Sequence, residues 1–204
     1  MHISWLGSTG IKIQTKPQND DITVLIDPYK SPSGQSPRSL TAHIALFTHG
    51  EDETVTLSGD PYTLSHPGEC EIKGVLLTAV PTEQEEKMIL RIDSESMSVA
   101  HLGLNNKIPS NDALESLGNV DILCIAVGGG EGYDPETAIK VINLIEPRVV
   151  IPLAFQSEND PQALPVEKFL KEMGAPASTP EKKVILKKKD LPLEDTQVIV
   201  LEKE

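Results

Sequence analysis

The sequence is poor in aromatic residues and in positive charge. Only 3% of its 204 residues are aromatic, and 18 lysines and arginines stand against 31 aspartates and glutamates, which gives a net charge of −13. Nucleic-acid binding depends on clustered Lys and Arg and on aromatic rings that stack on bases. We therefore expect no nucleic-acid partner. The one dense lysine run lies between positions 182 and 189. We interpret it as part of an exposed edge strand whose lysines prevent pairing with the strands of other molecules.

No apolar run approaches the length of a membrane span, and no basic segment precedes an apolar stretch at the N-terminus. Cysteine is also scarce. Cys70 and Cys124 lie far apart, and Cys124 falls in an apolar run, as expected for buried thiols of a reduced intracellular protein. We expect a cytoplasmic protein that does not bind membranes and has one domain over residues 1–204.

Short apolar runs between turn residues fill the first half of the chain and predict strands. They cover residues 2–6, 11–15, 22–26, 43–47, 70–72, 75–80, 87–92 and 97–102. In the second half, helical spacing predicts helices at 111–117, 135–145 and 165–173, between strands at 122–127, 149–152, 183–186 and 197–201. Asp134 before Pro135 is a typical helix start. Two packed sheets with helices on their outer faces fit this order.

The turn after the strand at 43–47 reads Thr48-His49-Gly50-Glu51-Asp52-Glu53-Thr54. It resembles the H-x-H-x-D-H motif of the metallo-β-lactamase superfamily, whose strand-end histidines and aspartate hold catalytic zinc. Further segments resemble the branch of Zn-dependent hydrolases related to L-ascorbate-6-phosphate lactonase. They are Val24-Leu25-Ile26-Asp27-Pro28-Tyr29, Pro67-Gly68-Glu69, Ala100-His101-Leu102-Gly103 and Glu146-Pro147-Arg148-Val149-Val150-Ile151-Pro152. The resemblance covers nearly the whole chain and implies an α/β (α+β) fold, a four-layer αββα sandwich.

The resemblance also implies where metal ligands would lie, at the strand ends of one edge. We place a vestigial site at His49, Glu51, Glu53, Thr54, Gln84, His101, Leu104 and Ala154. Of the family's ligands only His49 is retained. Leu104 stands where the family has a bridging aspartate and Ala154 where it has a histidine, and neither side chain can donate to a metal. We therefore expect no zinc centre of the family's kind and no bound cofactor.

Two interpretations of the remaining polar residues stay open. His49, Glu51 and Glu53 are weak candidates for a hard cation such as Mg²⁺, Ca²⁺ or Mn²⁺, but most acidic runs are solvated turns. His101 follows an apolar strand, which favours a hydrogen-bonded core histidine over a ligand. The glycines at 128–132 lack the spacing and the lysine of a phosphate loop and fit a strand-to-helix turn.

These observations favour a pseudoenzyme that acts by binding or assembly, with an unknown small molecule or protein as partner and homo-oligomers possible. The alternative is a hydrolase of a small ester, lactone or phosphorylated metabolite that uses a single cation at His49, Glu51 and Glu53. A third hypothesis is a structural subunit that pairs with an active paralogue. Function has to be argued from the site and not from the fold alone.

Overall fold

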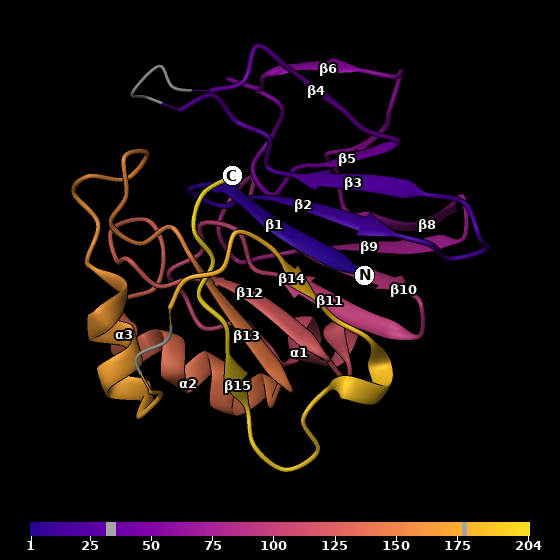
Figure 1. Ribbon diagram of the computed structural model, residues 1–204. Helices are drawn as coiled ribbons and strands as arrows, with labels where there is room; N and C mark the ends of the chain where they lie inside the picture. Colours follow the sequence, from indigo (N-terminus) through magenta and orange to yellow (C-terminus); the bar gives the residue numbers. More distant parts are fainter. Residues whose placement is uncertain (32–35, 177–178) are drawn as a thin grey trace.

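The computed structural model describes residues 1–31, 36–176 and 179–204, and its centre is a pair of β-sheets packed face to face (Figure 1). The first sheet has the strand order β14-β1-β2-β3-β5-β7. Its strands are β1 (His2–Gly7), β2 (Gly10–Thr15), β3 (Ile22–Ile26), β5 (Ile44–Leu46), β7 (Tyr62–Leu64) and β14 (Val184–Ile185). A small sheet of β4 (Ser39–Thr41) and β6 (Thr56–Ser58) lies beyond it.

The second sheet has the order β15-β13-β12-β11-β10-β9-β8. Its strands are β8 (Gly68–Ile72), β9 (Val75–Pro81), β10 (Met88–Ser94), β11 (Met97–His101), β12 (Ile122–Ala126), β13 (Val149–Leu153) and β15 (Gln197–Val198). Every residue of β11, β12 and β13 is buried. These neighbouring parallel strands are covered on both faces, which explains their continuous apolar runs.

The helices are α1 (Asn111–Leu117), α2 (Pro135–Ile145) and α3 (Val166–Met173), with a 3₁₀ turn, η1, at Lys188–Asp190. Their starts follow from local sequence: the side chain of Ser110 accepts from the Ala113 N–H, and that of Asp134 accepts from the Thr137 N–H. None of the helices in the described ranges is long and apolar enough to cross a membrane.

The two packed sheets agree with the sequence prediction, but the helical layers are unequal. Within the described ranges α1, α2 and α3 all lie on the side of the second sheet (Figure 1). The described residues of the first half of the chain form short strands and turns and supply no helix to the outer face of the first sheet. Part of that sheet is instead accompanied by the C-terminal segment, where Lys203 bridges to Trp5. The predicted α/β sandwich is thus confirmed, and the α-helices of the described ranges lie on its second sheet.

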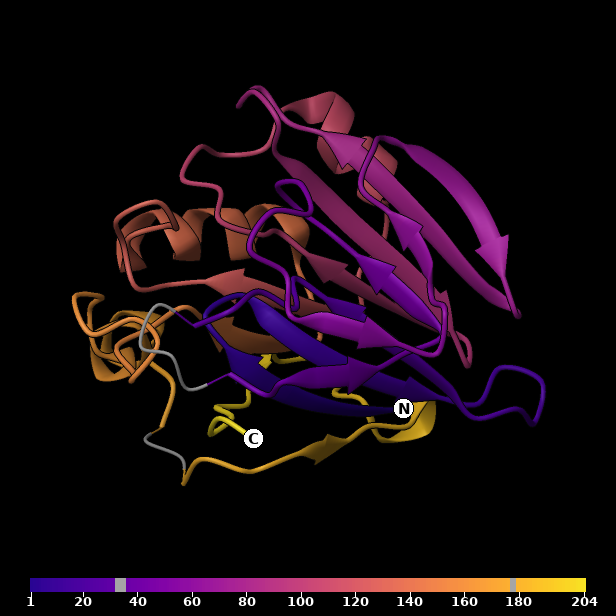
Figure 2. The same ribbon diagram turned by 90° about the horizontal axis from the view of Figure 1, so that it is seen from above.

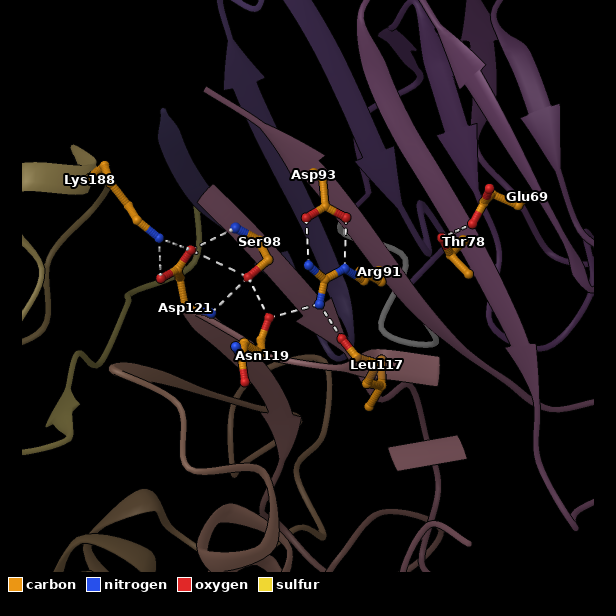
Figure 3. A network of polar contacts seen from close by, with 9 residues as sticks. All are labelled: Glu69, Thr78, Arg91, Asp93, Ser98, Leu117, Asn119, Asp121 and Lys188. Carbon is orange, nitrogen blue, oxygen red and sulfur yellow. Dashed lines mark hydrogen bonds and ion pairs between the residues drawn. The ribbon is translucent and has the colours of Figure 1, made fainter. Parts of the chain in front are cut away.

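The C-terminal segment is fastened to the second sheet through Asp121, whose side chain is 10% exposed. Its carboxylate accepts the Ser98 N–H at 2.9 Å and both of its oxygens lie 2.8 Å from Lys188 Nζ (Figure 3). Although burial raises the pKa of Asp121, the hydrogen bonds from Lys188 and Ser98 and the positive charges of Lys188 and Arg148 outweigh it and lower that pKa.

β14 is the outermost strand of the first sheet and is flanked by lysines, as the sequence predicted. Lys188 is an exception within that run, because its ammonium binds Asp121. The two cysteines also differ from each other. Cys124 is buried as expected, whereas Cys70 lies half-buried on the edge strand β8 and is not a core residue.

Candidate functional site

The loops that follow β5, β9, β11 and β13 meet at one edge of the sandwich. The Met88 N–H donates to the Thr48 carbonyl at 2.8 Å, and the Ala154 N–H donates to the Ser8 carbonyl at 3.0 Å. His101 reaches the Thr9 carbonyl, beside Ser8, at 2.8 Å. Seen from the side of the first sheet, the orange loop after β13 projects at this end of the molecule (Figure 2). His49 and Ala154 therefore lie on the same edge.

His101 is fully buried and both of its ring nitrogens are used inside the protein. The Gly103 N–H donates to Nδ1 at 3.1 Å, so Nδ1 carries a lone pair, and Nε2–H donates to the Thr9 carbonyl at 2.8 Å. Burial is the largest cause that lowers the pKa of His101, and it outweighs the nearby charge of Asp27. His101 is thus a neutral imidazole without a nitrogen left for a metal.

His49 is the last member of a chain of hydrogen bonds through Asp27, Thr48 and His49, called the relay below. Asp27, 1% exposed, accepts the Thr48 N–H at 2.7 Å and the Thr48 hydroxyl at 2.6 Å. The hydroxyl proton of Thr48 is committed to Asp27, so Thr48 Oγ1 accepts from His49 Nδ1, 3.0 Å away. His49 therefore carries its proton on Nδ1, and Nε2 keeps a lone pair with no hydrogen-bond partner in the described part of the chain.

The ring of Tyr29 covers this imidazole. The centroids of Tyr29 and His49 lie 4.4 Å apart, and the Tyr29 hydroxyl donates to the Gly50 carbonyl at 2.8 Å. Burial, helped by the charge of Asp27, raises the pKa of Tyr29, so its phenol stays protonated. A stacked aromatic ring thus occupies one side of the single histidine that the site retains.

The acidic turn after His49 is hydrogen-bonded to the backbone that follows β3. Thr54 forms an isolated bridge with Tyr29, and the Lys30 N–H donates to the Glu53 carbonyl at 2.7 Å. The Thr54 hydroxyl donates to the Glu51 carbonyl. Glu53 has a left-handed φ of 58°, and the side chains of Glu51 and Glu53 are exposed.

The other three positions of the vestigial site are Gln84, Leu104 and Ala154, and their recognisable roles are in the backbone structure of the surrounding loops. Gln84 Oε1 accepts the Asn106 N–H at 3.2 Å, and the Leu104 carbonyl accepts from Lys87 Nζ at 2.6 Å. Ala154 is buried with a left-handed φ of 49°. The strand ends lie close together. In the described part of the chain, however, Gln84, Leu104 and Ala154 make no hydrogen bond to His49.

The donor set does not fit the zinc centre that the fold family uses. Across residues 1–31, 36–176 and 179–204, no group of three or more His, Cys, Asp or Glu side chains is placed to hold a metal ion. His101 has both nitrogens engaged, and Leu104 and Ala154 offer no donor. A catalytic zinc ion needs three protein ligands and one open position for water.

Asp27, Thr48 and Tyr29 are site residues that the sequence analysis did not identify. Asp27 and Thr48 are 21 positions apart, and their pairing exists only because β3 and β5 lie side by side. One signal was available: Asp27 directly follows the buried strand β3, where an unpaired carboxylate would be costly.

Gly103 is required where the loops after β5 and β11 touch. A Cβ at Gly103 would lie 2.6 Å from Thr48 Oγ1, and Gly103 has a φ of +60°. We expect Gly103→Ala to lower the free energy of unfolding by about 2 kcal/mol, from overpacking together with left-handed strain. Urea denaturation measures this effect.

The matched control for Gly103→Ala is Gly130→Ala. Gly130 has a similar φ of +67° but nothing within 4 Å of the added Cβ. It should therefore cost only the backbone strain, about 1 kcal/mol. Equal losses in the two variants would contradict the contact with Thr48.

A cleft of about 980 Å³ opens at the same edge. Asp27 of the relay and the neighbouring Tyr29 are among its lining residues. Trp5 and Phe155, whose ring centroids are 4.6 Å apart, also line it. The C-terminal residues 200–204 close a further side. Asp27 and Tyr29, beside the vestigial site, therefore border a cavity large enough for a small molecule, although none of the eight vestigial positions lines it.

Comparison with known proteins places these observations in a family. Residues 2–154 match the β-lactamase superfamily domain. A curated relative, a metal-dependent hydrolase of the UPF0173 group from Methanopyrus kandleri, is 23% identical over 79% of this chain and 89% of its own length.

Solved structures give the same fold. A candidate Zn-dependent hydrolase of the metallo-β-lactamase superfamily from Thermotoga maritima superposes with a TM-score of 0.79 at 23% identity and covers 98% of both chains. The metallo hydrolase Igni18 from Ignicoccus hospitalis gives 0.66 at 13% identity over 91% of this chain and 99% of its own. The predicted metallo-β-lactamase type of fold is confirmed.

Proposed function

The chain belongs to the β-lactamase superfamily, and we propose that within it this protein is a non-catalytic binding member, which takes up a small molecule in the cleft at the strand-end edge without metal-dependent hydrolysis. One observation carries the proposal. Both nitrogens of His101 are bound within the protein, by the Gly103 N–H and the Thr9 carbonyl. His101 thus ties β11 to the turn between β1 and β2 and has no nitrogen free to ligate a metal.

The lack of a suitable donor set among the residues that the structure describes has a direct chemical consequence. Bound zinc lowers the pKa of water toward neutrality and so generates the nucleophile of a hydrolase. The carboxylates of Glu51 and Glu53 are exposed in a turn. A solvated carboxylate is a weak base at neutral pH. We therefore assign this protein a binding role.

The alternative is a metal-dependent hydrolase that uses one cation at His49. Two observations favour it: the Nε2 lone pair of His49 is without a hydrogen-bond partner in the described ranges, and the relative from Methanopyrus kandleri is named a metal-dependent hydrolase. In that case Glu51 or Glu53 would have to turn toward the imidazole, against the backbone bridge that Thr54 makes with Tyr29.

We expect less than stoichiometric zinc in protein purified without chelators or an affinity tag, since one imidazole cannot retain zinc against competing chelators. We also expect negligible hydrolysis of lactones, thioesters, phosphodiesters and β-lactams. Metal analysis tests the first point. The second is tested by comparing the wild type with His49→Ala, with and without added Mn²⁺.

Equal, negligible rates in all four samples support the binding role. One tightly held zinc per chain, or Mn²⁺-dependent turnover that disappears in His49→Ala, would establish the single-cation hydrolase instead. The variant is a fair control because His49 is half-buried at the edge, where its ring stacks on Tyr29 and makes one hydrogen bond, to Thr48.

A further inference from the structure

The side chain of Lys87 brings a positive charge into the edge where the loops after β9 and β11 meet. Its ammonium donates to the Leu104 carbonyl at 2.6 Å, and the side chain is 19% exposed. Hydrogen bonds with a charged donor are stronger than those with a neutral one. Glu131 lies 3.8 Å from the ammonium, but its side chain is 78% exposed, so this ion pair is weak. Lys87 is therefore bound mainly by the carbonyl of Leu104, one of the vestigial positions.

The turn between β9 and β10 fixes the backbone from which this side chain starts. The Lys87 N–H donates to the Gln84 carbonyl at 3.1 Å, and the Lys87 carbonyl accepts the Thr82 N–H at 3.1 Å. The N–H of the next residue, Met88, donates to the Thr48 carbonyl at 2.8 Å. The ammonium is thus held from both sides, by a closed turn at its base and by the loop after β11 at its tip.

A short series of contacts connects this charge with His49. Gly103, next to Leu104, packs so closely on Thr48 that an added Cβ would lie 2.6 Å from Thr48 Oγ1. The same oxygen lies 3.0 Å from His49 Nδ1. At 0.01 M salt the Debye length is about 30 Å, so a positive charge acts across these few contacts. A divalent cation that approached His49 would therefore be repelled by Lys87.

We infer that the Lys87 ammonium is a resident cation of this edge, which holds the loop after β11 in place and disfavours divalent metal ions at His49. The misfit with a metal centre then has two causes, the missing donor side chains and a fixed positive charge. The inference concerns this edge alone and does not depend on whether the cleft binds a small molecule. No covalent step is involved.

The variant Lys87→Met removes the charge and the donor and keeps a side chain of similar length. Mn²⁺ is titrated at about 0.01 M salt, where charges are screened least. Paramagnetic broadening of the His49 imidazole signals measures how strongly Mn²⁺ associates with this residue. We expect Lys87→Met to reach a given broadening at an Mn²⁺ concentration about 3-fold to 10-fold lower than the wild type requires.

Two further variants separate the local charge from other effects. Lys87→Arg keeps the charge and a donor, so it should respond to Mn²⁺ like the wild type. Lys140→Met removes one positive charge from an exposed ion pair with Glu136 on α2, so it changes the net charge by the same amount. It should change the Mn²⁺ requirement by less than about 2-fold.

Amide hydrogen exchange tests whether the ammonium holds the loops. The Met88 N–H donates to the Thr48 carbonyl, and the Gly103 N–H donates to His101 Nδ1. In Lys87→Met both amides should exchange about 10-fold faster than in the wild type, whereas Lys87→Arg should stay within about 2-fold. If Lys87→Met does not fold, Lys87→Gln replaces it in both measurements, because its amide keeps a donor without the charge.

An equal Mn²⁺ response in the wild type and in the neutral Lys87 variant, or an equal gain in Lys140→Met, would overturn the repulsion. Unchanged exchange of the Met88 and Gly103 amides would overturn the cross-link. Both results are separable from the proposed function. Mn²⁺-dependent turnover lost in His49→Ala overturns the binding role whatever the Lys87 variants show, and Lys87 variants that behave like the wild type leave the binding role in place.

Discussion

Replacement of Asp27 by alanine is expected to lower the free energy of unfolding by about 4 kcal/mol. The variant removes a buried acceptor of two hydrogen bonds, which leaves the Thr48 N–H without a partner and the Thr48 hydroxyl with only its contact to His49. Each hydrogen bond to a charged group is worth roughly 1.5–3 kcal/mol. Alanine also fits the left-handed φ of 48° at this position worse than aspartate does.

Urea denaturation of wild type, Asp27→Ala and Asp27→Asn measures this effect. Asparagine tolerates the left-handed backbone and can still accept the Thr48 N–H, so its loss should be smaller, about 1–2 kcal/mol. The exposed Asp52→Ala in the neighbouring turn is the control and should change stability by less than about 0.5 kcal/mol.

A different variant, Thr48→Val, reports on the proton of His49. In the wild type Thr48 Oγ1 accepts from Nδ1–H of His49, because its own proton goes to Asp27. Imidazole nitrogen chemical shifts should therefore show the Nδ1–H tautomer. In Thr48→Val this preference should disappear while His101 keeps its Nε2–H. An Nε2–H tautomer of His49 in the wild type would show that the relay does not form.

The sequence predicted an element correctly where all the residues that determine the element lie within one short segment. The helices at Asn111–Leu117 and Pro135–Ile145 have the predicted bounds, because each cap lies next to the helix that it starts. β4 and β6 escaped prediction. They are three-residue strands with mostly exposed side chains, and only their pairing with each other defines them.

The site shows the same division. The strand ends that carry it could be placed from the order of apolar runs, but the fate of each side chain depends on contacts that no local pattern contains. His101 is bound by Thr9, 92 positions away, and Asp27 by Thr48, 21 positions away. The composition of the turn at 51–54 favoured a solvated turn and left a cation site as the weaker alternative, and the backbone bridge of this turn to Tyr29 became visible only in three dimensions.

At the opposite end of the parallel strands, Asp121→Ala is expected to lower the free energy of unfolding by about 3 kcal/mol. The carboxylate ties β12 to β11 through the Ser98 N–H and to the C-terminal segment through Lys188 (Figure 3). Its removal leaves a buried N–H without a partner and frees the segment around η1. Urea denaturation, with Glu136→Gln as control, measures the loss. Glu136 makes an exposed pair with Lys140, so its change should stay below about 0.5 kcal/mol.

The contribution of Asp121 should also depend on pH, with a defined sign. Its pKa is lowered in the folded protein, so the unfolded chain takes up this proton more readily. The stability that Asp121 provides is then fully present above the ordinary aspartate pKa of 3.8 and is lost as the pH falls through the lower folded-state value. Asp121→Asn cannot titrate, so its stability should fall less steeply than that of the wild type below about pH 4. Parallel acid titrations of the two proteins, followed by urea denaturation at each pH, would contradict the assigned role if the slopes were the same.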